Sequence, residues 1–146
     1  MEEMEAALLA HEVAERANDL DGVLATLTAH PVYEFPSVGW KVEGQEGVIE
    51  FYRRTIPRMM ARNIQATKRL HALGQNALFR EAYVTIDADG ETATCNYCAV
   101  IVVDDDENLI ASERLYTDPY FAKVLAADLG EDFGDVPGVS RMDWVR

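Results

Sequence analysis

Residues 110–121, IASERLYTDPYF, combine a strand pattern, three charged side chains and a proline within twelve positions. Its β-branched and aromatic residues predict a strand, and Pro119 predicts that the strand stops and a helix begins. Successive side chains of a strand point to opposite faces, so Glu113, Leu115 and Thr117 share one face. The other face carries Arg114, Tyr116 and Asp118. If the first face is buried, Glu113 is a buried charge that needs either a partner or a chemical role.

This stretch is the last of four strand-like runs, which the turn-forming segments GQ, DADG and DDDEN separate. The four runs cover residues 64–74, 77–87, 91–103 and 109–118. Upstream, residues 30–44, HPVYEFPSVGWKVEG, predict a short edge hairpin that Pro36 and Gly39 interrupt.

Helical periodicity dominates the rest of the first half of the chain. Residues 3–17 predict an amphipathic helix, and residues 20–28 predict a short second helix with Asn18 or Asp19 as its N-cap. The stretch QEGVIEFYRRTIPRMM predicts a third helix that either ends near Pro57 or continues as a kinked turn through Met60.

The C-terminal part of the chain divides at Gly130. Residues 119–130 predict a short closing helix that stops at this glycine. Residues 131–146 predict an irregular tail, whose Phe133 and Trp144 are expected to pack on the domain or on a partner. Helices followed by a long antiparallel meander predict a single α+β domain over residues 1–130, with a concavity between its two layers as the expected small-molecule site.

Composition narrows the classes of partner. The chain has 146 residues, of which 49% are hydrophobic, and its formal net charge is −13. This charge disfavours nucleic acid and anionic membrane surfaces, since few basic residues are available to neutralise phosphates. No apolar run is long enough to span a membrane, and the acidic start MEEMEAALLAHE argues against a signal peptide, so a cytoplasmic location is expected.

Neither metal nor cofactor is expected. Cys95 and Cys98 lie in a β-rich run, where positions three apart point to opposite faces, so two reduced structural cysteines are favoured over a redox pair. His11, His30 and His71 are scattered over different elements, and neither a glycine-rich phosphate loop nor a nucleophile elbow occurs.

The order of elements, together with DLDG, the helix start GVIEFY and the strand ERLYTD, resembles the NTF2-like superfamily over roughly residues 5–130. More closely, it resembles the SnoaL-like and ketosteroid-isomerase-like branch. This resemblance implies a cone of three N-terminal helices packed on a curved antiparallel sheet with a short closing helix. It implies no single function, because the superfamily contains isomerases, cyclases, dehydratases, epoxide hydrolases and binding proteins.

Two well-known catalytic sets of these relatives are absent. Relative to ketosteroid isomerases, the base position falls on Phe35, the tyrosine position on His11 and the protonated-aspartate position near Ala99. Relative to limonene-type epoxide hydrolases, an aspartate aligns with Leu115, and an arginine–aspartate pair aligns with Glu81 and Tyr83. Neither mechanism is therefore expected.

The resemblance puts Glu113, Leu115 and Thr117 on the concave face. An antiparallel register then sets Ala99 opposite Glu113, Tyr97 opposite Leu115 and Cys95 opposite Thr117, with Phe79, Glu81 and Tyr83 on the same face. The expected catalytic residues are Glu113, Glu81 and His11. The expected ligand-binding residues are Tyr97, Tyr83, Phe35, Trp40, Leu115, Thr117 and Cys95.

Two carboxylates on one enclosed face suit acid/base chemistry, because burial or like charge raises the pKa of one toward neutrality. The alternative is that Arg80, Arg114 or a backbone donor holds each acid, and that His11 is a satisfied core residue.

The sequence thus predicts a SnoaL-like protein that binds a small hydrophobic molecule and possesses cofactor-independent acid/base chemistry of the cyclase, isomerase, dehydratase or hydrolase type. The alternative is a non-catalytic ligand-binding or assembly module. Relatives often dimerise through the outer sheet face, so a homodimer is expected there. That face carries Thr94, Asn96, Cys98, Val100, Ser112, Arg114 and Tyr116.

Overall fold

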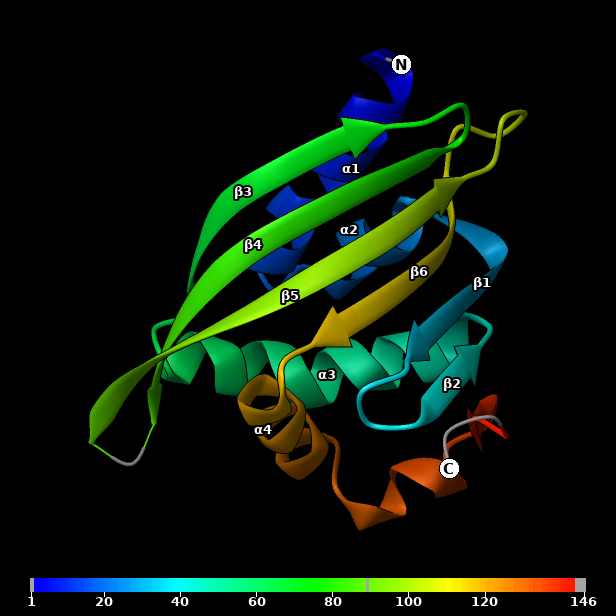
Figure 1. The fold of residues 1–146 in the computed structure, drawn as a ribbon. Coiled ribbons are helices and arrows are strands. Elements are labelled where there is room, and N and C mark those ends of the chain that lie inside the picture. The colour runs from blue at the N-terminus through cyan, green and yellow to red at the C-terminus, as the bar shows by residue number, and fades with distance from the viewer. Residues whose placement is uncertain (1, 89, 144–146) are drawn as a thin grey trace.

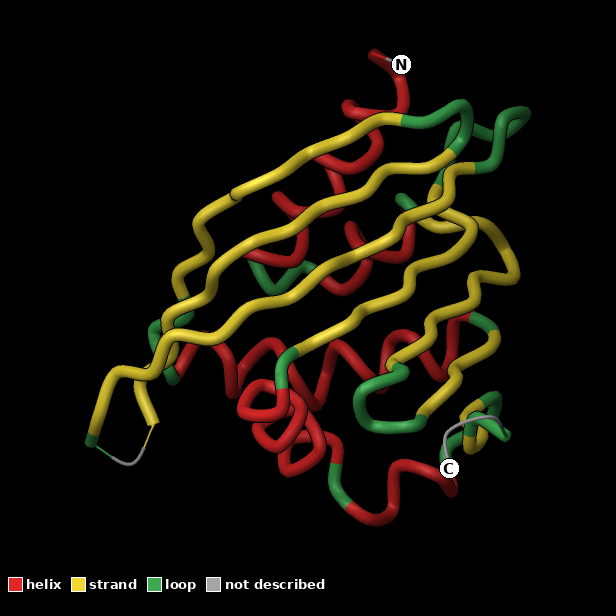
Figure 2. The backbone as a smooth tube through the Cα atoms, viewed as in Figure 1, coloured by secondary structure: helices red, strands yellow, loops and turns green. Residues whose placement is uncertain are grey.

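The computed structural model describes residues 2–88 and 90–143 and has an α+β architecture, as predicted. A curved sheet forms one layer, and α1, α2 and α3 lie together against one of its faces (Figure 1). The strand order is β3-β4-β5-β6-β1-β2-β7, and the tube in Figure 2 follows these strands across the sheet. The space between the two layers contains most of the core.

The helices begin and end close to the predicted positions. They are α1 (Glu2–Arg16), α2 (Leu20–Ala25), α3 (Gln45–Ala61) and α4 (Pro119–Leu129), followed by a 3-10 helix, η1 (Glu131–Asp135). Asp19 is the N-cap of α2, and its carboxylate accepts a hydrogen bond from the Gly22 amide at 2.9 Å. Asp118 caps α4 in the same way, accepting from the Phe121 amide at 2.8 Å. Short polar side chains at these positions satisfy amides that have no partner within the helix.

Helix α1 buries only some of its apolar side chains. Met4, Leu8 and His11 are buried, whereas Leu9 and Val13 are more than half exposed. The inward positions recur every three or four residues, as a helix packed on one side requires. This stripe brings His11 into the interior.

Helix α3 continues through Pro57 to Ala61, so the end near Pro57 is wrong and the alternative, a continuation through Met60, is the one found. Proline removes one helical hydrogen bond, but contacts beyond it hold the last turn in place. Just past the helix end, Arg62 forms a two-pronged ion pair with the buried Asp128 of α4, at 2.6 and 2.7 Å. This pair fixes the end of α3 against α4.

The strands match the predicted runs closely. They are β1 (Leu27–Phe35), β2 (Trp40–Glu43), β3 (Gln65–Leu73), β4 (Ala77–Ala88), β5 (Glu91–Val103), β6 (Ile110–Thr117) and β7 (Val139–Arg141).

The sheet is curved and mainly antiparallel, as expected, but one pairing is parallel, which makes it a mixed sheet. Strand β1 pairs with β6 in parallel, with Tyr33 opposite Glu113, while β3 to β6 form the predicted antiparallel meander. The hairpin of β1 and β2 therefore lies inside the sheet instead of at its edge. Parallel neighbours require a long connection, which here contains α3 and the whole meander.

The C-terminal segment, expected to be irregular, contains η1 and the short strand β7. Strand β7 pairs with β2 and covers the edge that β2 would otherwise expose. Phe133 of η1 is fully buried and meets Trp40 edge-on, with ring centroids 5.7 Å apart. Trp144 lies outside the described residues.

Within these residues, the structure has no helix that is long and apolar enough to cross a membrane.

Candidate active site

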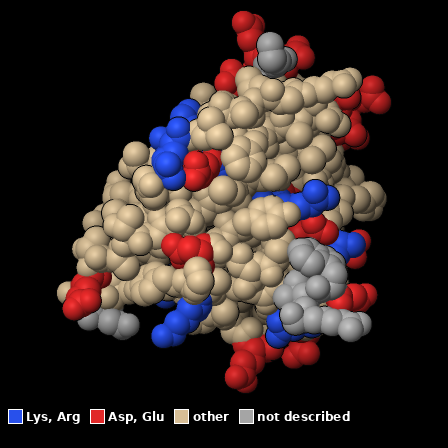
Figure 3. Space-filling model, viewed as in Figure 1, with Lys and Arg blue, Asp and Glu red and all other residues tan. Residues whose placement is uncertain are grey.

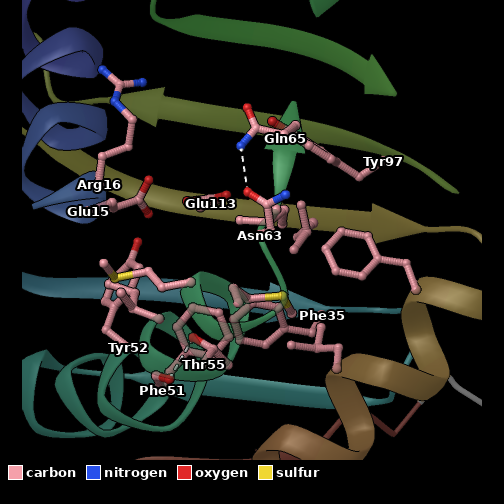
Figure 4. Close-up of a pocket in the computed structure, with 17 residues that line it drawn as sticks. Glu15, Arg16, Phe35, Phe51, Tyr52, Thr55, Asn63, Gln65, Tyr97 and Glu113 are labelled. Carbon is pink, nitrogen blue, oxygen red and sulfur yellow. Dashed lines mark hydrogen bonds between the residues drawn. The ribbon is translucent and has the colours of Figure 1, made fainter. Parts of the chain in front are cut away.

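A cavity of about 530 Å³ opens between the sheet and the helices α3 and α4 (Figure 4). Its wall is mainly apolar and aromatic, and its polar groups come from α1, α3, β3, β5, β6 and the turn between α3 and β3. The side chains that line it are Glu15, Arg16, Phe35, Phe51, Tyr52, Thr55, Ile56, Met59, Met60, Asn63, Ile64, Gln65, Tyr97, Glu113, Leu115, Phe121 and Leu125. The volume is within the usual range for small-molecule sites.

Glu113 is the central acid of this cavity. It projects from β6 between Glu15 and Tyr97 in Figure 4. Burial, followed by the charge of Glu15, raises the pKa of Glu113 to about 7, although the charges of His11 and Arg80 act in the opposite direction. Within residues 2–88 and 90–143, no group hydrogen-bonds to this carboxylate or pairs with it. Glu113 is therefore an acid that exchanges its proton near neutral pH.

His11 lies directly behind the cavity wall and is 2% exposed. The Thr26 hydroxyl donates to the Val23 carbonyl at 2.6 Å, so it accepts from Nδ1–H of His11, also at 2.6 Å. This hydrogen bond leaves Nε2 as the atom that gains or loses a proton.

Nε2 of His11 meets both a donor and a carboxylate. The Tyr52 hydroxyl lies 2.8 Å away, and Oε1 of Glu15 lies at 3.3 Å. Burial alone lowers the pKa of His11, but the hydrogen bond and charge of Glu15, with the charge of Glu113, raise it overall. Imidazole can therefore accept from Tyr52 when neutral and pair with Glu15 when charged.

Two tyrosines complete this buried network. The hydroxyls of Tyr33 and Tyr52 are 3.1 Å apart, and Tyr33 also lies 3.3 Å from Nε2 of His11. Burial raises the pKa of both phenols well above 10, so both stay protonated. They supply hydrogen-bond donors beside the acids without adding charge.

Glu15 is the member of the site that sequence reasoning missed. It faces the cavity from α1 and is 33% exposed. The signal was present in the helical period, because residues 8, 11 and 15 follow one another on a single helix face. Its place next to His11 explains why two acids and a histidine influence one another here.

Four of the residues predicted for the pocket line the cavity: Glu113, Tyr97, Phe35 and Leu115. The faces predicted for β5 and β6 are correct, but the register differs by two residues. Glu113 lies opposite Ile101, Leu115 opposite Ala99 and Thr117 opposite Tyr97. One residue of this shift arises at the turn, where Val103 pairs with Ile110, and the other arises from an irregularity in the pairing between Val102 and Val103.

Glu81 and Tyr83 lie on the outer face, so their predicted place in the pocket is wrong. In the β4–β5 ladder, Glu81 pairs with Cys98 and Tyr83 with Asn96, both of which point outward. Glu81 is ion-paired with Arg69 at 2.9 Å, and the same guanidinium stacks on the Tyr83 ring, 4.5 Å from its centroid. A slip of one residue in a strand exchanges its two faces.

The inward residues of this part of β4 are instead Arg80, Ala82 and Val84, which oppose Ala99, Tyr97 and Cys95. Arg80 is 15% exposed and forms an ion pair with Glu12 of α1. Ala82 and Val84 are buried, so the only charge that β4 turns toward the helices near the cavity is that of Arg80.

Trp40, Cys95 and Thr117 do not line the cavity. Trp40 packs between Phe133 and Arg141, whose guanidinium lies 3.5 Å from the ring centroid. Cys95 is buried with Val84, Ile86 and Phe121, and burial raises its pKa to about 11. The Thr117 hydroxyl is buried without a hydrogen-bond partner in the described part of the chain.

His71, whose face the sequence left undetermined, lies opposite Arg80 and meets Glu5 of α1 at 3.3 Å. It is thus separate from the cavity residues. Across the described residues, no three His, Cys, Asp or Glu side chains come together as a metal site would require.

The outer face of the sheet is mainly uncharged and carries a few separate charged patches, while many of the other charged side chains lie around its margins (Figure 3). Tyr83 and Tyr116 are each 41% exposed on this face, and Leu70 of β3 is 48% exposed.

Comparisons with known proteins agree with this geometry. The SnoaL-like domain family matches residues 8–112, which is more than half of the chain. No curated protein matches the chain significantly.

Solved structures of the same fold include TerC co-crystallised with polyporic acid, at a TM-score of 0.68 and 16% identity, over 84% of this chain and 97% of that chain. An NTF2-like protein of unknown function from Burkholderia pseudomallei K96243 has a TM-score of 0.69 and 17% identity, over 86% of this chain and 98% of that chain. An LEH-like epoxide hydrolase from M. tuberculosis has a TM-score of 0.62 and 25% identity, over 84% of this chain and 88% of that chain. The chain belongs to the SnoaL-like domain family, and its fold is that of the NTF2-like superfamily.

Proposed function

We propose that the protein binds a small, mainly apolar molecule in this cavity and catalyses cofactor-independent proton transfer, with Glu113 as the acid/base. The observation that carries the proposal is the Glu113 carboxylate, which lines the cavity, has no partner among the described residues and has a pKa of about 7. A group with a pKa near the working pH is half protonated, so it can both take and return a proton.

The reaction class that this arrangement suits is the movement of a proton on a carbon next to a carbonyl. The Glu113 carboxylate removes the C–H proton, and the electron pair moves into an enolate whose oxygen accepts a hydrogen bond from the protein. Protonated Glu113 then returns the proton to another atom of the same molecule. Tyr97 lines the same cavity, and because burial raises its pKa, its hydroxyl stays protonated and able to donate to the enolate oxygen.

Glu15 and His11 set the proton affinity of Glu113 without touching the reacting atoms. The negative charge of Glu15 raises the pKa of Glu113, and a protonated His11 lowers it. Because Tyr52 and Thr26 hold His11 in place, these opposing influences act from fixed positions. We assign His11 and Glu15 as positioning residues.

Epoxide hydrolysis by the limonene-type set is not favoured, even allowing for the corrected faces of β4. The positions aligned with the arginine–aspartate pair face outward, and the inward positions one residue earlier are Arg80 and Ala82. The arginine is then present, but its aspartate is still missing. Isomerase or cyclase chemistry, in which one carboxylate moves one proton, fits the residues better.

The proposal is tested by solvent-deuterium exchange, which needs no knowledge of the final product. The protein is incubated in D₂O with a panel of cyclic ketones and β-diketones, and loss of the α-proton signal is followed by NMR. We expect acceleration over buffer, and a loss of about 100-fold or more of that acceleration in Glu113→Gln. Glu81→Gln, the matched strand acid on the outer face, should leave the rate unchanged.

An active Glu113→Gln variant would remove the assignment. If no compound exchanges faster than in buffer, acid/base chemistry on carbon is rejected, and the alternative of a non-catalytic ligand-binding module takes its place. The open, largely apolar cavity supports ligand binding under both readings.

We further propose, from the mainly uncharged outer face of the sheet, that the protein forms a homodimer there. Sedimentation equilibrium of the native chain and of Tyr116→Glu tests this, since an added charge should dissociate the dimer.

A further inference from the structure

A second cavity, of about 490 Å³, adjoins the first one. The two cavities share part of their walls, so they lie side by side as two neighbouring chambers. The shared side chains are Glu15, Arg16, Ile64, Gln65 and Tyr97. We call the first the apolar chamber and the second the charged chamber.

The two chambers differ in chemistry. The apolar chamber is lined mainly by aromatic and aliphatic side chains. The charged chamber is lined by three cations, Arg16, Lys68 and Arg80, against two acids, Glu12 and Glu15. A local excess of positive charge is unusual in a chain whose net charge is −13.

Much of the hydrogen-bonding capacity of these cations is unused. Nε of Arg80 is buried and has no hydrogen-bond partner in the described part of the chain, although the guanidinium is paired with Glu12. Lys68 of β3 is exposed and forms no ion pair with any described residue. The ion pair of Arg16 with Glu12 is long, with 3.9 Å between nitrogen and oxygen, and the Arg16 side chain is 66% exposed. A buried donor without an acceptor is costly, and an acceptor supplied by a ligand would remove this cost.

We infer that the charged chamber holds a carboxylate of the ligand whose apolar body occupies the apolar chamber. The substrate is then an apolar carboxylic acid. This inference rests on the proposed function, because it assigns the second half of the same binding site. The excess of one positive charge matches a carboxylate better than a phosphate, which carries nearly two negative charges at neutral pH.

The shared wall determines where the reacting carbon lies along such a ligand. Glu15 and Tyr97 border both chambers, and Glu113 lines the apolar chamber that they help to close. The carbon that exchanges its proton therefore lies a few bonds from the carboxylate, where the apolar body begins. An oxo acid with its carbonyl near the carboxylate has this arrangement.

The test is competition against Nile red, a neutral dye that becomes fluorescent in apolar sites. The competitors are 6-phenylhexanoate, its methyl ester and 6-phenylhexan-1-ol, which share the apolar body and differ in the head group. We expect the carboxylate to displace the dye at a concentration about 10-fold lower than the alcohol does, because a charge-assisted contact contributes about that much.

Lys68→Gln should reduce this preference about 3-fold, and Arg80→Gln should abolish it. Lys123→Gln, an exposed lysine of α4, is the matched control and should keep the full preference. Circular dichroism verifies the fold of Arg80→Gln. Since Lys68 is exposed, its variant keeps the test valid even where the Arg80 variant fails to fold.

The outcomes separate the two proposals. If the ester and the alcohol displace the dye as well as the acid does, or if the preference is unreduced in Lys68→Gln or survives in a folded Arg80→Gln, the charged chamber does not bind a carboxylate and the proposed function stands. If neither the dye nor any competitor binds, ligand binding in the cone fails, and this inference fails with it.

Discussion

Glu113 and Glu81 are the same residue type on strands of one sheet, and they lie on opposite faces of it. Glu113 faces the helices, has no partner among the described residues and has a pKa of about 7. Glu81 faces outward and is held at 2.9 Å by Arg69, whose side chain is 44% exposed. Enclosure without a partner makes a carboxylate reactive, whereas pairing at the surface makes it structural.

The cysteines provide the largest expected difference between the two faces. Burial raises the pKa of both thiols, that of Cys95 to about 11, but Cys95 faces inward whereas Cys98 lies on the outer face and is partly accessible. At pH 8, an alkylating reagent should modify Cys98 about 100-fold faster than Cys95, because the reagent must reach a thiolate and Cys95 is both enclosed and the weaker acid. Peptide mass spectrometry after timed labelling measures both rates.

The matched variants for this experiment are Cys98→Ser, which should abolish labelling of the native protein, and Cys95→Ser, which should leave it unchanged. Equal rates at the two cysteines would show that the faces are not as distinct as the structure makes them.

The two glutamates should differ next in how they affect stability with pH. Glu113→Gln is expected to be more stable than the natural chain at pH 8 by about 3 kcal/mol, and to lose this advantage near pH 4.5. Glu81→Gln should change the free energy of unfolding by less than about 0.5 kcal/mol at either pH. Urea denaturation at the two pH values measures both differences.

The sign follows from the raised pKa. A Glu113 pKa of about 7, above its ordinary 4.5, means that the folded state binds the proton more tightly than the unfolded state does. Its contribution to stability is complete below pH 4.5 and is lost as the pH rises through 7. Glutamine resembles the protonated acid and never loses this contribution. A Glu113→Gln variant that is less stable than the natural chain at pH 8 would contradict an unpaired, enclosed carboxylate.

The smallest effect is expected for the outer ion pair itself. A double-mutant cycle with Arg69→Ala and Glu81→Ala should give a coupling energy below about 1 kcal/mol, which 1 M salt largely removes. The inward pair of Arg80 and Glu12, whose side chains are 15% and 23% exposed, should couple more strongly and respond less to salt. Similar coupling energies for the two pairs would show that burial does not strengthen the ion pair of Arg80 and Glu12.

The sequence was sufficient to predict the fold class, the family and the places of the helices and long strands. The faces of β5 and β6 were also predictable, since alternation along ERLYTD and CNYC fixes them. The face of β4 was not recovered, because apolar and aromatic residues occupy both of its sides, such as Phe79 and Tyr83 against Leu78 and Val84. The apolar character of the residues alone could therefore not identify the inner face of β4.

A stronger signal for β4 was available in its turn. The dipeptide Asp89–Gly90 is typical of a two-residue hairpin, which sets Ala88 opposite Glu91. That pairing carries Arg80 and Ala82 to the inner face. Neither the parallel pairing of β1 with β6 nor the return of β7 to the sheet could be read from local patterns, because both join segments that are distant in the chain.

The parallel pairing of β1 with β6 has a consequence for how the chain folds. Residues 27–35 emerge early in synthesis together with their hairpin partner β2, yet their second sheet neighbour is residues 110–117. Until that strand has been made, Tyr33 and Phe35 have no finished core to enter, so an incomplete chain exposes an apolar strand with free backbone groups. Contacts between such distant segments also slow folding. The strand that carries Glu113 is therefore also the one that the N-terminal strand β1 must await before the sheet can form around it.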